Sequence, residues 1–429
     1  MKKIGVALFG MGTVGTGVAR LLLESADHLA ARSGFRFELR HVVVRDLELR
    51  RGLTLPPGIM TRDPERVFDD DAVHIGIEVM GGIEHAATTI RRLIDSGKEI
   101  VTANKALLCD QGPELVDYAW SRGRSIAFEA AAAGGIPIVS ALRRSLTGNV
   151  VHRIEGILNG TSNFILSRMT EEDCSYGEAL LQAQAMGYAE ADPTFDVDGT
   201  DAAQKLAILV LLAFGARVPL ESIHRKGIDS LERADLAYAA DLGYTIKLLA
   251  DATLVNEALQ LSVRPTLIPL GRPLAAVGGA LNAVLVEGDP VGPLCFTGAG
   301  AGSGPTASAI VADVIETAIG SIRLGPPPLI DRKDLAPLIS SPDDEVRRYY
   351  LRFKVDDRPH AFADIAHVLG NHGISLASIV QKEVRGINAP VPVIVVTHET
   401  SLKALRAAES ELDGLDTIHP PLVRIPIVD

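Results

Sequence analysis

The stretch KIGVALFGMGTVGTGVARLLL, residues 3–23, decides the expected fold of the N-terminal part of this chain. Its first part, residues 3–9, is a short apolar run typical of a buried strand, and residues 18–23 repeat apolar side chains with helical spacing. Gly10, Gly12 and Gly15 lie between them, so the chain turns from strand to helix within a few residues. This order predicts the first βα unit of a dinucleotide-binding domain.

Each glycine of this turn has its own physical task in such a domain. Gly10 permits the tight turn, Gly12 lets the backbone approach a pyrophosphate, and Gly15 allows the helix to pack closely on the sheet. The N-terminus of the helix attracts the anionic phosphates. A purely structural turn is the alternative, because the glycine pattern taken alone is a weak signal.

The segment that follows continues the alternation of strands and helices. Apolar runs at 39–44, 75–80 and 99–103 have strand character, and residues 86–95 have helical spacing. Alternating strands and helices predict βαβ units around a parallel sheet. We therefore expect a Rossmann-type α/β domain over residues 1–130.

Two further domains are expected downstream. Residues 131–320 contain glycine-rich turns and apolar helices at 201–214 and 307–319, which predict an α+β domain with an open sheet. Residues 346–429 have the strand and helix order of a ferredoxin-like βαββαβ fold. Its strands are expected at 349–355, 374–381, 391–397 and 422–427, and its helices at 361–372 and 402–412. A linker is expected before it, flanked by the turn-rich segments Gly325–Pro328 and Ser340–Asp344.

The composition excludes several classes of function. Apolar residues make up 47% of the 429, and 42 basic against 54 acidic side chains give a net charge of −12. A net acidic chain without basic runs is a poor candidate for binding nucleic acid or an anionic membrane. The longest apolar stretch, residues 206–216, is too short to span a membrane. Cys109, Cys174 and Cys295 form no zinc motif and fit a reducing compartment, so we expect a soluble cytoplasmic protein.

The second strand ends in a charged loop that bears on the choice of cofactor. Val44 is followed by Arg45 and Asp46. An arginine at this place can bind a 2′-phosphate with two parallel hydrogen bonds, which favours NADP over NAD. Asp46 keeps NAD use open, since an acidic residue here binds a ribose 2′-hydroxyl. The plainer alternative is that Arg45 is an ordinary solvated charge.

Lys105 follows the strand at 99–103 within two residues. In an open parallel sheet the ligand crevice lies at the carboxyl ends of the strands. This position therefore predicts that Lys105 lies where a nicotinamide and a substrate meet. An ordinary surface lysine is the alternative.

The segment GYAEADPTFDVDGTDAAQK, residues 187–205, is the most informative in the chain. It places five acids before and at the start of an apolar helix: Glu190, Asp192, Asp196, Asp198 and Asp201. Asp201 and Lys205 are four residues apart, so they share one face of that helix. The acids as a group suit a substrate ammonium group. The alternative is a helix-capping loop with an internal ion pair.

A turn of small residues, EAAAAGGIP at 129–137, follows another expected strand. One carboxylate together with turn carbonyls offers the oxygen ligands that a hard cation prefers. Tight packing without a metal is the alternative.

These segments together resemble the homoserine dehydrogenase family, of the type that carries a C-terminal ACT domain. The resemblance covers essentially the whole chain and rests on GMGTVG at 10–15, VTANKALL at 101–108, FEAAAAGGIPI at 128–138, GILNGTSNFIL at 156–166 and, most specifically, GYAEADPTFDVDGTDAAQKLAIL at 187–209. It implies an NAD(P)-dependent interconversion of L-homoserine and L-aspartate 4-semialdehyde by hydride transfer, in the biosynthesis of threonine, methionine and isoleucine from aspartate. It also implies a central domain for catalysis and dimerisation, with a helix at about 300–320 that returns to the Rossmann domain.

The resemblance assigns roles to the candidate residues. Lys205 corresponds to the proton donor and acceptor for the substrate oxygen, and Lys105 corresponds to a lysine that contacts this oxygen and the cofactor. The implied substrate-binding residues are Glu190, Asp192, Asp196 and Asp201; the cofactor-binding residues are Gly10, Gly12, Thr13, Val14, Gly15, Arg45, Thr102, Lys105, Gly187 and Gly302; the ligands of a monovalent cation, sodium or potassium, are Glu129, Ala132, Gly134 and Ile136.

The C-terminal part resembles an ACT domain through Val355–Pro359 and Gly370–Ser375. In the family such domains often mediate inhibition by threonine, through a turn after the first strand. That turn usually carries glycine after the proline, whereas this chain has His360. Inhibition by threonine is therefore a hypothesis, and a role in assembly alone is the alternative. The resemblance also implies a homodimer or a homotetramer.

Two other functions compete with this interpretation. The first is another semialdehyde-linked NADP dehydrogenase, of the acylating kind that needs a cysteine nucleophile; Cys109 and Cys295 lack a matching histidine arrangement. The second is a non-catalytic amino-acid sensor. The presence of both Lys105 and Lys205 disfavours it, because a sensor needs no proton relay.

Overall fold

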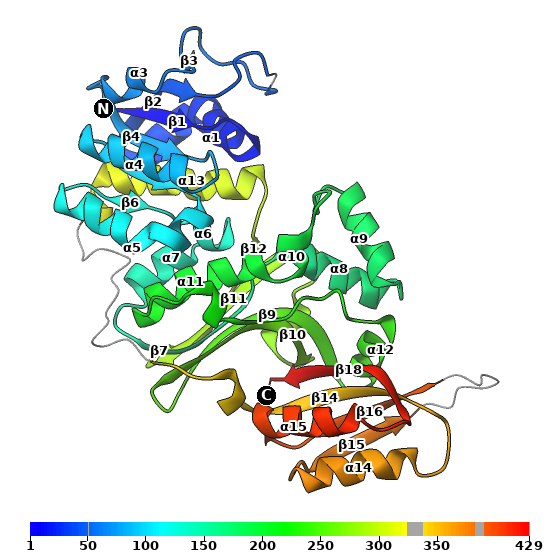
Figure 1. Cartoon of the computed structure of the whole chain (residues 1–429). Helices are drawn as coiled ribbons and strands as arrows, with labels where there is room; N and C mark the ends of the chain where they lie inside the picture. Colours follow the sequence, from blue (N-terminus) through cyan, green and yellow to red (C-terminus); the bar gives the residue numbers. More distant parts are fainter. Residues whose placement is uncertain (50, 324–337, 382–389, 429) are drawn as a thin grey trace. The chain divides into compact units, whose positions relative to one another are not determined.

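The fold is described by a computed structural model, which covers residues 1–49, 51–323, 338–381 and 390–428 (Figure 1). The chain forms two compact units. The first contains Met1–Ile154, Asp201–Leu220 and Leu281–Pro337 as far as it is described, and the second contains Glu155–Thr200, Glu221–Ala280 and Leu338–Asp429 as far as it is described. None of the helices in the described ranges has the length and hydropathy of a membrane span.

The first unit is built on the parallel sheet that the sequence predicts. Six strands lie in the order β3-β2-β1-β4-β5-β6, and every neighbouring pair is parallel. The strands are β1 (Lys2–Phe9), β2 (Phe35–Val43), β3 (Met60–Thr61), β4 (Val73–Glu78), β5 (Glu99–Thr102) and β6 (Ile126–Ala127). Strand β1 is almost wholly buried at the centre, which explains its continuous apolar run.

Helices cover this sheet and extend the first unit. They are α1 (Thr13–Glu24), α2 (Ala26–Ser33), α3 (Glu65–Phe68), α4 (Glu84–Asp95), α5 (Lys105–Ser121), α6 (Ala130–Ala133), α7 (Ile138–Ser140), the π-helical turn η1 (Ala141–Ser145), α11 (Thr200–Phe214), α13 (Ser303–Ile319) and the 3₁₀ turn η4 (Ser321–Arg323). A hairpin of β11 (Leu281–Asp289) and β12 (Gly292–Ala299) precedes α13. One core cluster contains side chains of β1, α1 and α13, such as Leu8, Val18 and Ile310.

Helix α13 comes late in the chain but lies against α1. A Cβ atom added at Gly17 would meet the Ser303 Oγ at 2.6 Å, so this close approach requires glycine. The Ser303 hydroxyl also donates a hydrogen bond to the Thr13 carbonyl at 2.9 Å. The domain limits that the sequence suggests, 1–130, 131–320 and 346–429, stay a prediction.

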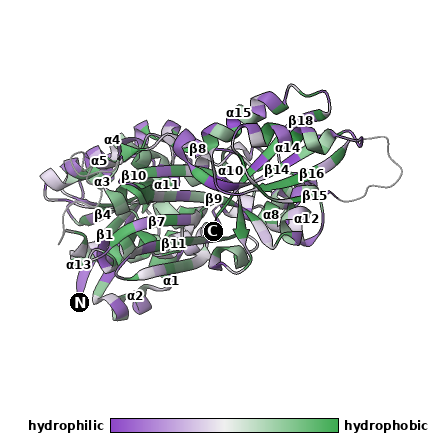
Figure 2. Cartoon of the chain, turned by 90° about the horizontal axis from the view of Figure 1, so that it is seen from below, coloured by the Kyte–Doolittle hydropathy of each residue, from purple (hydrophilic) through white to green (hydrophobic). Residues whose placement is uncertain are grey.

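The second unit contains the C-terminal βαββαβ fold that the sequence predicts. Its strands β14 (Val346–Val355), β15 (Leu376–Gln381), β16 (Val391–Thr397) and β18 (Ile418–Ile427) pair antiparallel in the order β18-β14-β16-β15, with a short β17 (Thr400–Ser401) on β14. Helices α14 (Ala361–Asn371) and α15 (Leu402–Leu412) bury apolar faces against this sheet. Figure 2 shows strands such as β16 largely hydrophobic and helices such as α15 carrying hydrophilic residues.

The rest of the second unit surrounds two long antiparallel strands, β9 (Tyr244–Val255) and β10 (Ala258–Pro269). The other elements are the end of β7 (Val150–Ile157), α8 (Gly160–Glu171), α9 (Tyr176–Ala185), α10 (Thr194–Val197), η2 (Leu220–Ser222), β8 (His224–Arg225), α12 (Arg233–Asp241), η3 (Pro273–Ala276), β13 (Leu338–Ile339) and η5 (Pro342–Asp344). Strand β10 also pairs with β18 of the C-terminal fold, at Leu267 and Ile427.

The expected linker between the two turn-rich segments lies largely outside the described residues, but the second flanking segment, residues 340–344, is bonded to the second unit. Strand β13 pairs parallel with β10, the Ser340 amide donates to the Leu259 carbonyl at 2.9 Å, and residues 342–344 form the turn η5. Strand β10 offers its edge as a partner, so a Ser-, Pro- and Asp-rich composition does not leave this segment as a free spacer. The other linker signal, Gly325–Pro328, lies outside the described residues.

A buried charge pair joins α12 to the first strand of the C-terminal fold. Asp235 and Arg352 are 0% and 1% exposed, and the Arg352 Nε donates to the Asp235 Oδ1 at 2.6 Å. The Arg352 Nη2 donates to Oδ2 at 3.1 Å, and the Tyr350 hydroxyl donates to Oδ1 at 3.0 Å. With the Glu232 amide, which donates to Oδ2 at 2.9 Å, the buried carboxylate accepts four hydrogen bonds.

Replacing Asp235 with alanine should strongly destabilise the protein. The buried Arg352 would lose its buried counter-charge and keep only the half-exposed Glu232, 3.2 Å from its Nη2, and breaking a buried pair costs about 3–5 kcal/mol. The midpoint of urea unfolding of the full chain measures this effect. Asp343→Ala is the control, because Asp343 and Arg406 form an exposed pair and should contribute less than about 1 kcal/mol. Equal shifts for both variants would contradict the assignment.

Candidate active site

The glycine turn after β1 has the geometry that the sequence predicts. Gly10 has a φ of +96°, where a side chain is strained, and a Cβ atom at Gly15 would lie 2.2 Å from the Gly10 carbonyl oxygen. At Gly12, by contrast, no protein atom lies within 4 Å of a built Cβ. The backbone is thus open at the place where a pyrophosphate would approach the start of α1, and the turn fits a dinucleotide.

A second glycine turn lies beside the first. Gly302, with a φ of +108°, precedes α13, and the next residue, Ser303, is bonded to the Thr13 carbonyl. The sequence-predicted cofactor contacts Thr13 and Gly302 therefore lie together, although they are far apart in the chain. Val14 is half-buried in the first turn of α1.

The loop after β2 is held to the glycine turn by Arg51. Its guanidinium donates to the Met11 carbonyl at 3.1 Å, to the Leu49 carbonyl at 2.7 Å and to the Asp46 carbonyl at 2.5 Å. Arg45 is exposed in this loop. Among the described residues no hydrogen bond or ion pair engages its side chain, so the guanidinium of Arg45 is available to a ligand.

The two candidate lysines share one carboxylate. The Lys205 Nζ donates to the Asp201 Oδ2 at 2.7 Å, and the Lys105 Nζ lies 3.1 Å from the Asp201 Oδ1. The side chains of Asp201 and Lys205 are 12% and 11% exposed, whereas that of Lys105 is 37% exposed. The sequence predicts the contact within α11 but not the contact between α11 and α5. The result is two ammonium groups held at one place, one buried and one open to a ligand.

A chain of hydrogen bonds fixes the start of α5 and hence Lys105. The Asn104 side chain caps the helix by accepting from the Leu107 amide at 3.2 Å, and it donates to the Gly82 carbonyl at 2.7 Å. The Thr102 hydroxyl accepts from the Asn104 amide at 3.0 Å and donates to the Glu78 carboxylate at 2.7 Å. Thr102 thus uses its hydroxyl inside the protein.

Glu78 is a residue of this region that the sequence analysis misses. It ends β4, it is fully buried, and its carboxylate also accepts from the Met80 amide at 2.8 Å. Burial raises its pKa above the usual value, although the hydrogen bonds from Thr102 and Met80 act in the opposite direction. The position of Glu78 in the sequence could have identified it. It is an acidic residue directly at the end of an apolar strand, and the carboxyl ends of the strands form the edge of the sheet where ligands bind.

Cys109 ties α5 to α11. Its thiol donates to the Gln204 carbonyl at 3.1 Å. Burial, more than any nearby charge, raises the pKa of this thiol to about 12. A thiol that stays protonated is a poor nucleophile, which counts against the acylating alternative.

The turn at 129–137 is tightly built. Glu129 is 6% exposed, and its carboxylate accepts from the Val139 amide at 2.9 Å and the Ser140 amide at 2.8 Å. Burial raises the pKa of Glu129, and the buried Asp313, which accepts from the Glu129 amide at 2.7 Å, has its pKa raised by burial as well. In the described ranges no group of three or more His, Cys, Asp or Glu side chains is suited to a metal.

A buried amide, unpartnered among the described residues, lies beside this turn. A Cβ atom at Gly134 would lie 2.2 Å from the Gly300 carbonyl oxygen, and one at Gly300 would lie 2.0 Å from the Asn282 Nδ2. Asn282 is 1% exposed, and neither its amide nitrogen nor its amide oxygen has a hydrogen-bond partner among the described residues. Carbonyl and amide oxygens suit a hard cation, whose candidate ligands also include the backbones of Ala132 and Ile136.

The acidic segment before α11 belongs to the second unit. The carboxylates of three of its acids accept hydrogen bonds from other residues of this unit. The Asp192 Oδ1 accepts from the Thr194 amide at 3.1 Å, the Asp196 Oδ1 accepts from the Asn159 side chain at 2.8 Å, and the Asp198 Oδ1 accepts from the Thr200 amide at 2.8 Å. The hydrogen bonds from Thr194 lower the pKa of Asp192. The helix-capping interpretation is therefore confirmed for Asp198, which precedes α11.

Glu190 differs from these acids. It is exposed, and its backbone carbonyl accepts from the Gln184 side chain at 3.2 Å. In the described part of the chain no hydrogen bond or ion pair engages its carboxylate. Gly187, which follows α9 with a φ of +76°, has open space where a Cβ would lie. Both are free to contact a ligand.

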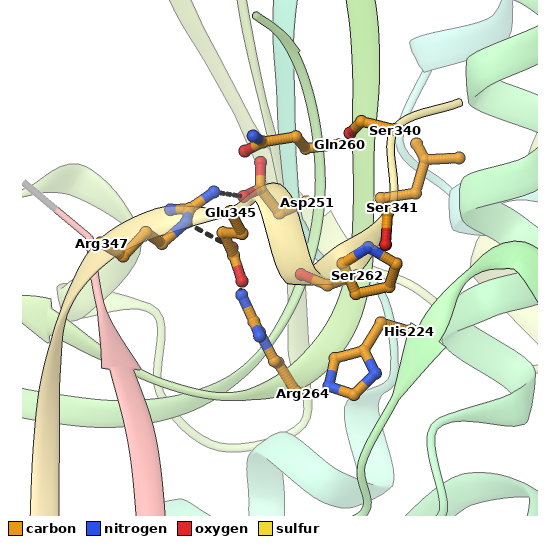
Figure 3. A pocket seen from close by; sticks show the side chains of 11 residues that line it. His224, Asp251, Gln260, Ser262, Arg264, Ser340, Ser341, Glu345 and Arg347 are labelled. Carbon is orange, nitrogen blue, oxygen red and sulfur yellow. Dashed lines mark hydrogen bonds and ion pairs between the residues drawn. The ribbon is translucent and has the colours of Figure 1, made fainter. Parts of the chain in front are cut away.

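The second unit also contains a polar pocket, whose charged side chains bind one another (Figure 3). Arg347 binds Asp251 and Glu345, and Glu345 also binds Arg264. Burial first, and then the charge of Arg264, lowers the pKa of His224 in its wall to about 4. The free space is about 10 Å³, enough for one water molecule at most. This cluster joins β10 to β14 and is no ligand site.

Comparison with known proteins shows similarity over the whole chain. The family profile described as "Homoserine dehydrogenase" matches residues 137–315, "Homoserine dehydrogenase, NAD binding domain" matches 10–129, and "ACT domain" matches 349–414. A homoserine dehydrogenase of Synechocystis sp. is 43% identical over 438 residues, which cover 98% of this chain and 99% of that protein.

Solved structures agree with this similarity. A homoserine dehydrogenase from Thiobacillus denitrificans has a TM-score of 0.91 at 41% identity, covering 100% of this chain and 99% of that one. A hyperthermophilic archaeal homoserine dehydrogenase mutant, solved in complex with NADPH, has a TM-score of 0.62 at 25% identity, covering 76% of this chain and 99% of that one.

Iodoacetamide should label Cys109 far more slowly than Cys295. The thiolate is the reactive form, and burial disfavours it at Cys109, whereas Cys295 is exposed on β12. Mass spectrometry of peptides after timed labelling of the native protein measures both rates, and urea-unfolded protein provides the control in which the rates converge. Rapid labelling of Cys109 in the native protein would favour the acylating alternative.

Proposed function

Because this chain belongs to the homoserine dehydrogenase family and carries an ACT domain, we propose that it interconverts L-homoserine and L-aspartate 4-semialdehyde with NADP as the hydride carrier. The observation that carries the proposal is the Asp201 carboxylate between the ammonium groups of Lys105 and Lys205. The acylating and sensor alternatives are not favoured, since the chain has a buried, unreactive Cys109 and retains both lysines.

We assign the proton transfer to Lys205. When bound, the nicotinamide supplies the hydride chemistry, taking a hydride from the carbinol carbon or returning one to the carbonyl carbon. In the reduction the Lys205 ammonium gives a proton to the oxygen and becomes a neutral amine, and in the oxidation this neutral amine takes the hydroxyl proton as the carbonyl forms. Asp201 supports this role because it holds the Lys205 amine in one orientation, 2.7 Å from its own carboxylate.

Lys105 stabilises the charge that develops on the substrate oxygen during reduction. Its ammonium is 37% exposed and is positioned by the capped start of α5, so it is prepared before the substrate arrives. Thr102 acts through this helix start rather than through a hydroxyl contact with the cofactor, because its hydroxyl is already bonded to Glu78.

Glu190 and Asp201 are the proposed ligands of the substrate ammonium group. The carboxylate of Glu190 is exposed, as a ligand for a charged amine requires. Asp192 and Asp196 act by shaping their loop, since both carboxylates bind residues of the second unit, Thr194 and Asn159. Gly187 provides backbone close to the cofactor.

The preference for NADP is assigned to Arg45. Its exposed guanidinium stands in a loop that Arg51 ties to the glycine turn, where an adenosine ribose follows the pyrophosphate in this type of domain. The archaeal relative solved with NADPH supports this choice. Asp46 carries a carboxylate that accepts from the Glu48 amide at 2.9 Å, so it is already engaged.

We further propose a monovalent cation, sodium or potassium, at the turn of Glu129, Ala132, Gly134 and Ile136. The Glu129 carboxylate is occupied by two backbone amides, so the turn would bind the ion through its backbone oxygens. The free amide of Asn282 beside Gly300 supports a polar guest in this neighbourhood. The ion would stabilise the turn by satisfying carbonyl groups.

Three further proposals concern the protein as a whole. We propose a homodimer or a homotetramer, a cytoplasmic location in line with the three free cysteines, and feedback inhibition by threonine at the ACT turn. His360 stands at this turn with a φ of +78°, directly before α14. It is exposed, so its side chain partly obstructs an effector rather than filling the core.

Lys205→Ala should abolish turnover and leave NADP binding nearly unchanged. Loss of a positioned proton donor costs roughly 10²–10⁴-fold in kcat. Absorbance of the reduced nicotinamide with L-homoserine and NADP measures the rate, and nucleotide fluorescence titration measures the affinity. Lys403→Ala, at an exposed site on α15, is the control and should be fully active. Wild-type turnover in Lys205→Ala would contradict the proton-transfer role assigned to Lys205.

Arg45→Ala should weaken NADP far more than NAD. A charge-assisted hydrogen bond to phosphate contributes about 1.5–3 kcal/mol, so we expect roughly a 10–100-fold rise in the dissociation constant for NADP. Isothermal titration with each nucleotide checks the selectivity. Arg62→Ala provides a matched loss of an exposed arginine nearby. Equal losses for NADP and NAD would count against recognition of the 2′-phosphate by Arg45.

L-threonine should inhibit the enzyme, and His360→Gly should lower the threonine concentration for half inhibition. Glycine removes the obstructing side chain and tolerates the left-handed backbone that costs a histidine about 1–2 kcal/mol. Initial rates at increasing threonine test both statements, with His372→Gly, at the other end of α14, as the control. Full activity of both proteins in saturating threonine would leave the domain with an assembly role only.

A further inference from the structure

A cavity of about 310 Å³ lies in the first unit, outside the residues assigned to catalysis. Its walls are Glu129 and the segment after it, including α7 and η1, and one face of α13. The carbonyl groups proposed to hold a cation belong to Ala132, Gly134 and Ile136, which are not among its lining residues. Its size reaches the lower end of the range of small-molecule sites.

Most charges in the wall are engaged by the protein. The Glu129 carboxylate accepts two backbone amides, and Asp313 accepts from the Glu129 amide. Glu316 binds Arg144 at 2.5 Å and also Ser321. These three carboxylates therefore have partners that do not involve a bound ligand.

Arg143 is the exception in this wall. It is half-buried in the π-helical turn η1 and lines the cavity, but among the described residues no hydrogen bond or ion pair engages its guanidinium. An arginine stays charged in proteins and carries five donors in a planar fork. A carboxylate matches that fork with two parallel hydrogen bonds. Arg144 is already paired with Glu316, so Arg143 is the arginine of this wall that can bind an anion directly.

The remaining lining limits the size and character of the ligand. Pro137, Val139, Ala309, Ala312 and Ile322 supply apolar surface, and Ser308 supplies a hydroxyl. An apolar wall of this kind suits a short aliphatic chain rather than a phosphate or a sugar. The closed pocket of Figure 3 is the contrast, because its arginines are paired and its free space is about 10 Å³.

We propose that this cavity binds a short aliphatic carboxylate, whose carboxyl group is held by the Arg143 guanidinium. The ligand is either an unsubstituted carboxylate or an α-amino acid of the same size. An amino acid would place its ammonium group near the carboxylates of Glu129 and Asp313. The site is separate from the proposed catalytic one and does not depend on it.

Isothermal titration of the full chain with butyrate and with L-2-aminobutyrate tests the proposal. The two probes share a carbon skeleton and differ in the ammonium group. Saturating NADP and constant sodium keep the other sites unchanged. Binding in the millimolar range or tighter is expected for at least one probe. Tighter binding of L-2-aminobutyrate identifies an amino-acid site, and equal binding identifies a carboxylate site.

Variants assign the binding to this cavity. Arg143→Met should weaken it roughly tenfold or more, because a charge-assisted pair of hydrogen bonds is lost. Arg143→Lys keeps the charge without the fork and should lie between. Ala312→Leu, at an exposed position of the lining, should obstruct the cavity even if Arg143→Met fails to fold. Arg36→Met, which removes an exposed arginine paired with Asp27, is the control and should bind normally.

Binding must also survive in Lys205→Ala, since the catalytic lysine does not line the cavity. Absence of binding for both probes would overturn the proposal. Affinities unchanged by both Arg143→Met and Ala312→Leu would do the same. Binding that disappears in Lys205→Ala would relocate the probes to the catalytic site and would also overturn it.

Discussion

The arrangement of the proposed catalytic groups depends on one carboxylate, that of Asp201. It joins the buried ammonium of Lys205 on its own helix to the more exposed ammonium of Lys105 on α5. Two like charges so close would repel each other without a shared counter-charge. The pair therefore fixes the relative position of two helices and keeps two proton-bearing groups together before any substrate is present. Because the ion pair of Asp201 and Lys205 is only partly exposed, salt screens it less than it screens a surface ion pair.

A second set of hydrogen bonds holds the start of α5, and therefore Lys105, against the parallel sheet. The Glu78 carboxylate at the end of β4 holds Thr102 at the end of β5, and Thr102 in turn holds the cap residue of α5. Each link is a hydrogen bond in a dry place, where a lost partner costs more than the bond itself contributes. The buried acid thus acts as a structural anchor. The same logic explains the closed cluster around Arg347, in which every added charge is met by an opposite one.

Local patterns predicted much of this structure. The glycine turn, the parallel sheet, the βαββαβ order and the contact between Asp201 and Lys205 all follow from spacing within a few residues. The contact of Lys105 with Asp201 could not be predicted, because it depends on how two distant helices pack. Helix α5 could not be recognised in the sequence, because Gly112 and Pro113 interrupt its helical pattern. In the structure Pro113 is buried inside the helix. The bonding of β13 and Ser340 to β10 could not be predicted either, because it depends on the edge that a distant strand offers.

The buried pair of Asp235 and Arg352 bears on how separable the C-terminal fold is. Compact regulatory domains are often regarded as modules that can be removed or exchanged at a linker. Here the two partners lie on either side of that boundary, with Asp235 on α12 and Arg352 on β14, and β18 pairs directly with β10. A truncated chain would keep an acid whose arginine has gone and would lose the pairing of β18 with β10 at Leu267. Domain exchange in this protein would therefore need matched changes in α12 and at this contact on β10, in addition to a cut in the sequence before β14.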